Sequence, residues 1–226
     1  LYPQMVGRFI FSNTACQKGK GTDFTRAVIK KYMWNYFCNY GSEGGVIQAD
    51  IHGYYANMRH DKVAKCLEES VDRDTYEMSM DVLNSQYAGE IGYNPGSQMV
   101  QIAGISLLNK LDHFIKEQLH VKYYIRYMDD LWILWHDLEE LQVWFGIIKE
   151  KLSELGFELN ARKSHVTKLS KGFLFLGFHY RMTPTGKIIM TLNSDNIRHE
   201  RKKLRRMVNK SKKGEIEPSK VDECYR

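Results

Sequence analysis

The stretch Tyr124-Ile125-Arg126-Tyr127-Met128-Asp129-Asp130-Leu131-Trp132-Ile133-Leu134 places two adjacent acids between two apolar runs. Residues 124–127 and 131–134 are rich in aromatic and aliphatic side chains, which favours two strands joined by a turn. Neighbouring carboxylates repel each other, and apolar surroundings make both charges costly unless a cation neutralises them. Aspartate is also a common turn residue, so an ordinary turn stays open as the alternative. The apolar flanks on both sides favour a bound cation.

A third acid, Asp50, ends the short apolar run Val46-Ile47-Gln48-Ala49-Asp50-Ile51, which has the pattern of a buried strand. If this strand lies beside the 124–134 hairpin, Asp50 and Asp129 meet at one edge of a sheet. Carboxylates within reach of each other suit Mg²⁺, a hard ion that prefers oxygen ligands. Two such ions about 4 Å apart can bind the attacking and leaving oxygens of a phosphoryl displacement. The pattern therefore predicts nucleotidyl transfer, provided that the acids converge.

Helical and strand-like patterns alternate irregularly along the rest of the chain. Apolar spacing and end signals predict helices over residues 23–40, 61–70, 73–86, 100–119, 138–155 and 198–213. Short apolar runs predict strands over residues 46–51, 124–127, 131–134, 157–159, 173–180 and 187–192. Because the strands and helices alternate irregularly, we expect an α+β fold with a mainly antiparallel sheet.

The composition is that of a globular protein: 226 residues, 43% of them hydrophobic and 27% charged, which excludes collagen-like and wholly disordered chains. No apolar run approaches the about 18 residues of a membrane span, and no signal-peptide pattern opens the chain. The four cysteines form no C-x-x-C pair, which argues against a disulfide framework or a zinc site and favours reduced thiols in a cytoplasmic protein. They are Cys16, Cys38, Cys66 and Cys224. Because the sequence starts at Leu1 rather than Met, we expect a fragment.

The positive charge is concentrated in one segment. The whole chain carries +6, whereas residues 198–213 hold nine Lys or Arg against Glu200 alone and carry +8, so the rest carries −2. A concentrated basic run is typical of a surface that binds a phosphate backbone, and a solvated helix face is the alternative. Ile197, Leu204 and Val208 would give this helix an apolar stripe.

Five segments resemble motifs of reverse transcriptases and occur in the order of that family. They are residues 49–55 (ADIHGYY), 96–101 (GSQMVQ), 126–131 (RYMDDL), 159–164 (LNARKS) and 175–178 (FLGF). Within the family, the resemblance is strongest to bacterial enzymes of diversity-generating retroelements and of the group II intron-like kind. Val100 and Pro95 depart from the usual residues at their positions, and the acids do not.

The resemblance implies a right-hand polymerase palm, an α+β domain whose antiparallel sheet packs on helices, with partial fingers and the start of a thumb. Residues 1–45 would be partial fingers and the connection to the palm, 46–195 the palm with its catalytic motifs and primer grip, and 196–226 the basic first helix of the thumb. The first fingers motifs would then precede Leu1, and the thumb would continue after Arg226.

The resemblance also implies roles for single residues around the metal. Asp50, Asp129 and Asp130, with the carbonyl of Ile51, would bind Mg²⁺, with Mn²⁺ as the alternative ion. Lys163 would protonate the pyrophosphate leaving group as a general acid, although a solvated loop lysine fits the sequence too.

Further expected residues would contact the nucleotide or the nucleic acid. Tyr55 would lie under the deoxyribose and exclude a 2′-hydroxyl, with Tyr54 as the competing candidate, and Gly96 and Gln101 would border the nascent base pair. Leu176 and Gly177 would press the primer terminus toward the metals. The expected phosphate contacts are Lys18, Lys20, Arg26, Arg201, Lys202 and Arg205. Arg126 would either pair with a nearby acid or touch the substrate.

The function implied is an RNA-directed DNA polymerase that extends a DNA primer with dNTPs on an RNA template, with an accessory protein as a further partner and no membrane. One alternative is a defence-associated or retron-type reverse transcriptase. Another is a catalytically silent, RNA-binding palm retained for splicing or packaging, against which the three intact acids argue. A generic basic RNA-binding module is a third, and the −2 charge outside residues 198–213 disfavours it.

Overall fold

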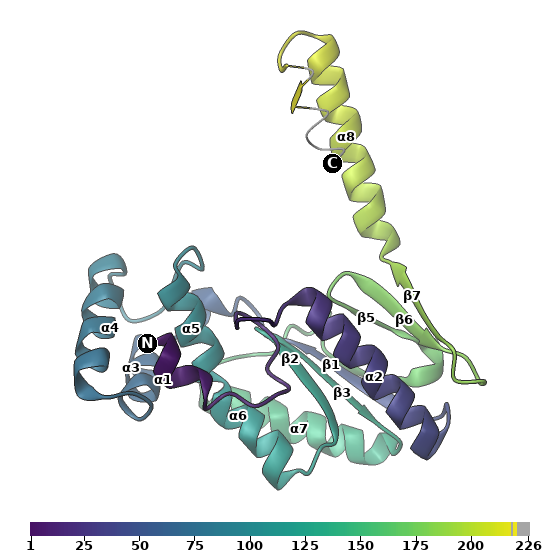
Figure 1. Ribbon diagram of the computed structural model, residues 1–226, viewed down its shortest axis with the longest axis horizontal. Helices are drawn as coiled ribbons and strands as arrows, with labels where there is room; N and C mark the ends of the chain where they lie inside the picture. The colour runs from purple at the N-terminus through teal and green to yellow at the C-terminus, as the bar shows by residue number, and fades with distance from the viewer. Residues whose placement is uncertain (218, 221–226) are drawn as a thin grey trace.

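The computed structural model describes residues 1–217 and 219–220 and contains two antiparallel sheets (Figure 1). The larger sheet has the strand order β2-β3-β1-β4, and the smaller sheet is the meander β5-β6-β7. Helices cover the larger sheet, so the predicted α+β class with antiparallel sheets is confirmed. Cys224, one of the four cysteines, lies outside the described residues.

The elements have the following bounds. The helices and helical turns are α1 (Tyr2–Val6), α2 (Thr22–Tyr40), η1 (Tyr55–Asn57), α3 (His60–Glu68), α4 (Arg73–Gln86), α5 (Gln98–Leu107), α6 (Asn109–His113), η2 (Phe114–Gln118), α7 (Leu138–Glu154), η3 (Leu169–Lys171) and α8 (Ser194–Lys212). The strands are β1 (Gly45–Asp50), β2 (Tyr123–Tyr127), β3 (Asp130–Trp135), β4 (His165–Lys168), β5 (Phe173–Phe175), β6 (Phe178–Met182) and β7 (Ile188–Leu192).

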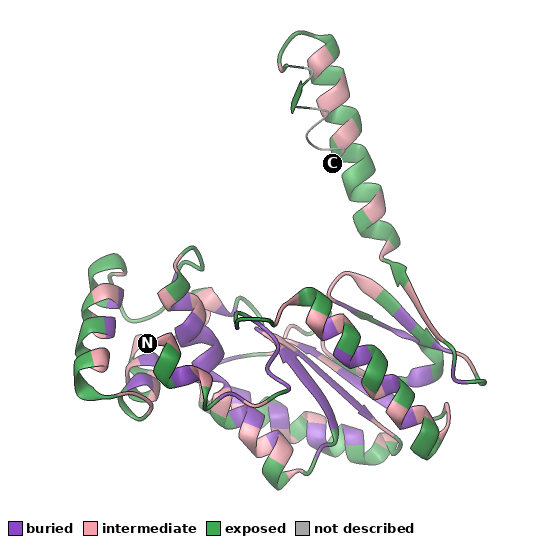
Figure 2. Cartoon of the chain, viewed as in Figure 1, coloured by how far each residue is buried: buried purple, intermediate pink, exposed green. Residues whose placement is uncertain are grey.

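Side chains of the larger sheet alternate between two cores, as the two-residue period of a strand requires. On one face, Ile47 of β1 and Ile133 of β3 join a core with side chains of α3, α5 and α7. On the other face, Val46 and Trp132 join a core with α2 and the smaller sheet. The central strands are therefore buried on both sides (Figure 2).

Helix α7 shows how local sequence produces one of these layers. Asp137 caps it, because its carboxylate accepts the backbone N–H groups of Glu139 and Glu140 at 2.8 and 3.1 Å. Its buried residues recur at helical spacing and pack on the sheet: Leu141, Trp144, Ile148 and Leu152. An acidic first turn complements the helix dipole as well.

Helix α8 differs from the others because it projects away from both sheets (Figure 1). The whole helix lies within the described residues, and none of its own residues is buried. Ile197, Leu204 and Val208 are half-buried, whereas the basic side chains Arg201 and Lys202 are exposed. The predicted helix and its apolar stripe are therefore present.

Three predicted elements differ in the structure. The strand expected over 173–180 is two strands, β5 and β6, because Leu176 and Gly177 take positive φ values of 46° and 79° and reverse the chain. The helix expected over 100–119 breaks at Leu108 into α5, α6 and the π-helical turn η2. The strand expected over 157–159 reduces to one bridge between Ile51 and Leu159.

Two elements that the sequence did not predict are α1 and β4. Strand β4 is a half-exposed edge strand with polar ends, so it lacks the apolar run that marks a buried strand. Among the residues that the structure describes, none of the helices combines the length and the apolar character needed to cross a bilayer.

Two glycines provide a test of the packing around β1. A Cβ at Gly45 would lie 2.9 Å from Leu141 Cδ1 and 3.0 Å from the Thr167 carbonyl oxygen, whereas one at Gly146, on the exposed side of α7, meets nothing within 4 Å. Gly45→Ala should lower the free energy of unfolding by about 1–3 kcal/mol through overpacking. Gly146→Ala should raise it by about 0.5–1 kcal/mol through helix propensity. Urea denaturation of both variants measures this, and equal effects would contradict the packing described.

Candidate active site

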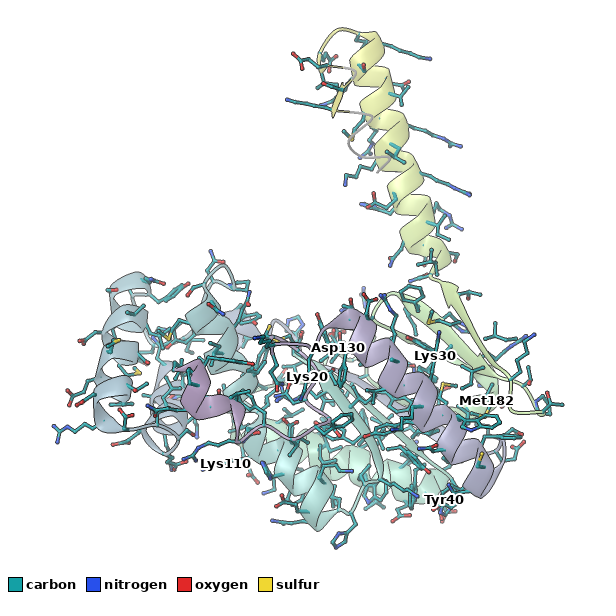
Figure 3. All side chains as sticks on the ribbon, in the orientation of Figure 1. Lys20, Lys30, Tyr40, Lys110, Asp130 and Met182 are labelled. Carbon is teal, nitrogen blue, oxygen red and sulfur yellow. The ribbon has the colours of Figure 1, made fainter. Side chains whose placement is uncertain are left out.

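The three acids come together where β1 and β3 end beside each other. Asp50 is the cross-strand partner of Asp130 in the antiparallel pair β1–β3. The next residue, Ile51, donates its N–H to the carbonyl of Asp129 at 3.2 Å. Figure 3 shows Asp130 in the middle of the molecule, at the start of β3. Like charges directly opposite each other destabilise a sheet, so this register needs a compensating charge.

The protonation of these acids reflects that repulsion. Burial, followed by the nearby charges of Asp129 and Asp50, raises the pKa of Asp130 to about 7, and Lys163 opposes the shift. Burial also raises the pKa of Asp129, with its own backbone N–H opposing and Asp50 adding to the rise. The ionised forms of both carboxyls are therefore disfavoured until positive charge reaches them.

Residues 160–164 form a turn that wraps around Asp50. The Asp50 carbonyl accepts the N–H of Asn160 at 2.8 Å, and the Asp50 N–H donates to the Ser164 hydroxyl at 3.0 Å. The ammonium of Lys163 lies 2.9 Å from Asp50 Oδ2, and this contact raises the pKa of Lys163. Lys163 thus supplies one positive charge to the acidic group formed by Asp50, Asp129 and Asp130.

The donor set fits a hard divalent cation, although the side chains are not arranged around one. Among the described residues, no group of three or more His, Cys, Asp or Glu side chains is positioned as a ready metal cluster. The Asp50 carboxylate is engaged by Lys163. The backbone of Ile51 lies beside the same acids, because its N–H donates to the Asp129 carbonyl. The oxygen donors and their mutual repulsion are those that Mg²⁺ or Mn²⁺ would satisfy.

The two tyrosines that follow Asp50 have different surroundings. Tyr54 is 3% exposed, and its hydroxyl donates to the carbonyl of Gly104 in α5 at 2.5 Å. Tyr55 is half-buried, and Cys16 and Asp129 lie near enough to raise its pKa beyond the effect of burial. Tyr54 is therefore a core residue, and Tyr55 is the ring that a nucleotide sugar could reach.

The segment around α5 brings one predicted residue close to this site. The Gln101 side-chain amide donates to the carbonyl of Pro95 at 3.2 Å, and its oxygen accepts from the Cys16 thiol at 3.7 Å. Gly96 lies in the exposed loop before α5, where its N–H donates to Asn94 Oδ1 at 3.3 Å. Gln101 thus shares the neighbourhood of Cys16 with Tyr55, whereas Gly96 is bonded within its own loop.

A cavity of about 520 Å³ joins the acids to the β5–β6 hairpin. Its lining includes Asp50 and Asp130 on one side and Leu176 and Gly177 on the other. The Gln48 amide of β1 donates to the Leu174 carbonyl of β5 and connects the two sheets. The hairpin turn predicted from the sequence therefore borders the same space as the acids.

The predicted phosphate-binding residues fall into two groups. Lys20 and Arg26 are engaged within the chain: the Lys20 ammonium donates to the Asn13 carbonyl at 2.8 Å, and Arg26 pairs with Asp23 and lies 4.8 Å from the ring centre of Phe178. The other group comprises exposed residues, namely Lys18 in the loop before α2 and Arg201, Lys202 and Arg205 on α8.

Arg126 pairs with a nearby acid, Asp112, which the sequence patterns had not singled out. Arg126 and Asp112 of α6 form an ion pair in which both side chains are fully buried, with 2.5 Å between Nη2 and Oδ2. Asp112 follows Leu108 by four residues and precedes Ile115 by three, so it lies on the apolar side of the 100–119 pattern, and an acid on that side was the available signal.

Residues 11–180 match the reverse transcriptase (RNA-dependent DNA polymerase) family. The chain belongs to this family. The resemblance to reverse transcriptases that the sequence motifs indicated is thereby confirmed at the level of the family. No protein of curated function matches the sequence.

Solved telomerase structures share the fold of this reverse transcriptase domain. Apo telomerase from Candida tropicalis, truncated from the C-terminal domain, aligns with a TM-score of 0.61 and 14% identity over 80% of this chain and 41% of that one. Telomerase from Candida albicans, in complex with a TWJ fragment of telomeric RNA, aligns with a TM-score of 0.62 and 13% identity over 81% of this chain and 36% of that one. The chain thus spans about two fifths of these telomerases.

The acidic group should make the metal-free domain less stable as the pH rises. The pKa of Asp130, raised to about 7 in the fold, lies above the about 3.9 expected in the unfolded chain, so the native state binds more protons in between. Stability should therefore fall between about pH 4 and pH 7, by at most about 4 kcal/mol. Asp130→Asn should flatten this slope and be more stable than wild type at pH 8. Urea denaturation in EDTA tests this, and a wild type that gains stability relative to the variant over that range would contradict it.

Proposed function

We propose that this chain is the catalytic part of an RNA-directed DNA polymerase that adds dNTPs to a primer 3′-hydroxyl on an RNA template. The observation that carries the proposal is the meeting of Asp50, Asp129 and Asp130 at the end of two paired strands. Membership in the reverse transcriptase family supports it. A purely structural role would not need three mutually repelling carboxylates at one place.

Asp50, Asp129, Asp130 and the Ile51 carbonyl would hold the divalent cations, Mg²⁺ or Mn²⁺. When bound, these ions lower the charge of the triphosphate and make the primer hydroxyl more nucleophilic. The side chains themselves would orient that hydroxyl and the α-phosphate relative to each other. Lys163, paired with Asp50, would be near enough to donate a proton to the leaving pyrophosphate.

Tyr55 would support the deoxyribose and exclude a 2′-hydroxyl, and Gln101 would border the nascent base pair. Their common neighbour Cys16 supports one pocket for both. Gly96 would border the same base pair through its backbone, which requires the loop before α5 to approach the nucleotide.

Leu176 and Gly177 would press the primer terminus toward the acids across the cavity that they share. Arg201, Lys202 and Arg205 of α8 would contact phosphates of the template–primer duplex, because they are exposed on a helix that projects from the sheets. Lys18 would contact the template. Lys20 and Arg26 would have to leave their present partners to do so.

The domain division follows from these assignments. Residues 1–45 would be partial fingers, 46–195 the palm and 196–226 the start of the thumb, part of which lies outside the described residues. The sequence motifs favour a bacterial enzyme of the diversity-generating retroelement or group II intron-like kind, with a retron or defence type as the alternative. The free thiols of Cys16, Cys38 and Cys66 fit a cytoplasmic location. An accessory protein partner stays a prediction.

Primer extension tests the proposed function directly. The full-length parent protein should extend a DNA primer on an RNA template in Mg²⁺ and stop in EDTA. Asp129→Asn should lower the rate by about 10³-fold or more, because a metal ligand is lost. Its thermal unfolding temperature should not fall, since one repelling charge is removed.

Asp61→Asn is the matched control, because Asp61 is an exposed acid of α3 that pairs with Arg59. It should extend primers at the wild-type rate. A wild type without activity would support the silent RNA-binding palm, and an Asp129→Asn variant with near-normal activity would refute the metal assignment.

Tyr55 and Tyr54 can be separated by sugar discrimination. Tyr55→Ala should raise the incorporation of ribonucleotides relative to deoxyribonucleotides by about 10- to 100-fold, because the volume that excludes the 2′-hydroxyl is removed. Tyr54→Phe, which loses only the bond to Gly104, should leave discrimination unchanged. Single-nucleotide incorporation assays with both sugars measure the ratio. If discrimination changes with Tyr54→Phe and not with Tyr55→Ala, the assignment is wrong by one residue.

A further inference from the structure

The guanidinium of Arg126 makes more contacts than an ion pair requires. Arg126 and Asp112 are both fully buried, and Nε and Nη2 donate to Oδ1 and Oδ2 of Asp112 at 2.7 and 2.5 Å. Asp112 Oδ1 also accepts from the Tyr124 hydroxyl at 2.6 Å. A buried pair is costly unless every donor and acceptor is satisfied, so the remaining Arg126 donors are informative.

Those remaining donors reach two backbone carbonyls. Nη1 donates to the carbonyl of Met128 at 2.9 Å, and Nη2 donates to the carbonyl of Ile105 at 2.9 Å. The first carbonyl belongs to the peptide that joins Met128 to Asp129. The guanidinium therefore fixes the orientation of the peptide that leads directly into the catalytic acid.

Met128 needs such support. Its φ of 54° lies in the left-handed region, which a long side chain without a local hydrogen-bonding group seldom adopts. Backbone conformations of this kind persist only where the surroundings hold them. The bond from Arg126 acts on this residue, because it engages the Met128 carbonyl from within the core.

The second carbonyl links the same guanidinium to the nucleotide side of the site. Ile105 lies in the last turn of α5, whose carbonyls lack partners within the helix. The neighbouring Gly104 carbonyl accepts from Tyr54, and a Cβ at Gly104 would lie 3.4 Å from Tyr55 Cε1. Arg126 thus contacts both the turn of Asp129 and the helix on which Tyr55 packs.

We propose that Arg126 is a positioning residue that fixes the Asp129 carboxylate near Asp50 through its bond to the Met128 carbonyl. The inference rests on the proposed function, because it requires Asp129 to be a metal ligand. A simple counter-charge for Asp112 would not need the planar fork of an arginine, since a lysine also neutralises a carboxylate. The fork is needed to reach Asp112, Met128 and Ile105 together.

Arg126→Lys separates these roles, because lysine keeps the charge beside Asp112 and loses the bonds to the two carbonyls. Mn²⁺ binding, measured by electron paramagnetic resonance on the full chain, should weaken about tenfold, as for other residues that orient metal ligands. The kcat for single-nucleotide addition should fall by about 10- to 100-fold, and more than the KM for dNTP rises. Asp112→Asn keeps the bonds of Arg126 to the carbonyls, so it should lower stability and change Mn²⁺ affinity less than threefold.

Two further variants distinguish a general loss of stability from the loss of the bonds that Arg126 makes to the two carbonyls. Leu152→Ala, a fully buried residue of α7, lowers stability away from the site and should leave Mn²⁺ affinity unchanged. If Arg126→Lys does not fold, Arg126→Met with Asp112→Asn removes both buried charges together, and this double variant should show the same loss of Mn²⁺ affinity.

Met128→Gly tests the strained turn itself. Glycine adopts a positive φ without strain, so Met128→Gly added to Arg126→Lys should recover part of the lost Mn²⁺ affinity. No recovery would overturn the role of the turn.

Asp129→Asn, measured in parallel, distinguishes the two levels of the account. If it binds Mn²⁺ like wild type, the proposed function fails and this inference with it. If it loses binding while Arg126→Lys stays within about twofold of wild type, Arg126 is only the partner of Asp112, and the positioning role alone is overturned.

Discussion

The repulsion between Asp50 and Asp130 across the β1–β3 pair is the constraint on which the rest of the structure depends. A register shift of one residue would turn the carboxylate of Asp50 to the opposite face of the sheet and abolish the site. The apolar residues of β1 prevent that shift, because Ile47 and Val46 would each have to leave their own core and enter the core on the opposite face. Packing of the sheet on both faces therefore enforces an electrostatic cost at one end of it, and Lys163 offsets part of that cost.

The surrounding elements each control one side of this acidic group. The 160–164 turn binds the backbone of Asp50 and supplies Lys163, and the β5–β6 hairpin closes the cavity beside it. From within the core, Arg126 engages the peptide before Asp129. Such an arrangement leaves the carboxylates close to one another yet short of positive charge, which is the state that a divalent cation would relieve.

Much of this could be predicted from local sequence, and the remainder depends on contacts between distant residues. The turn at Asp129, the strand that ends in Asp50 and the basic α8 all follow from short patterns. The break of the predicted 100–119 helix at Leu108 does not, because the carbonyls near it accept from Tyr54 and Arg126, which are remote in sequence. The sequence likewise predicted the meeting of the acids only on the condition that β1 lies beside β3, since strand pairing is not encoded by either strand alone.

The most direct test of the account is to locate Mn²⁺ by anomalous diffraction from crystals of the full-length protein with a template–primer duplex and an incoming dNTP. The account predicts two Mn²⁺ ions about 4 Å apart, bound by the carboxylates of Asp50 and Asp129, with Lys163 displaced from Asp50. Ordered nucleic acid and dNTP with no Mn²⁺ between these two carboxylates would contradict it.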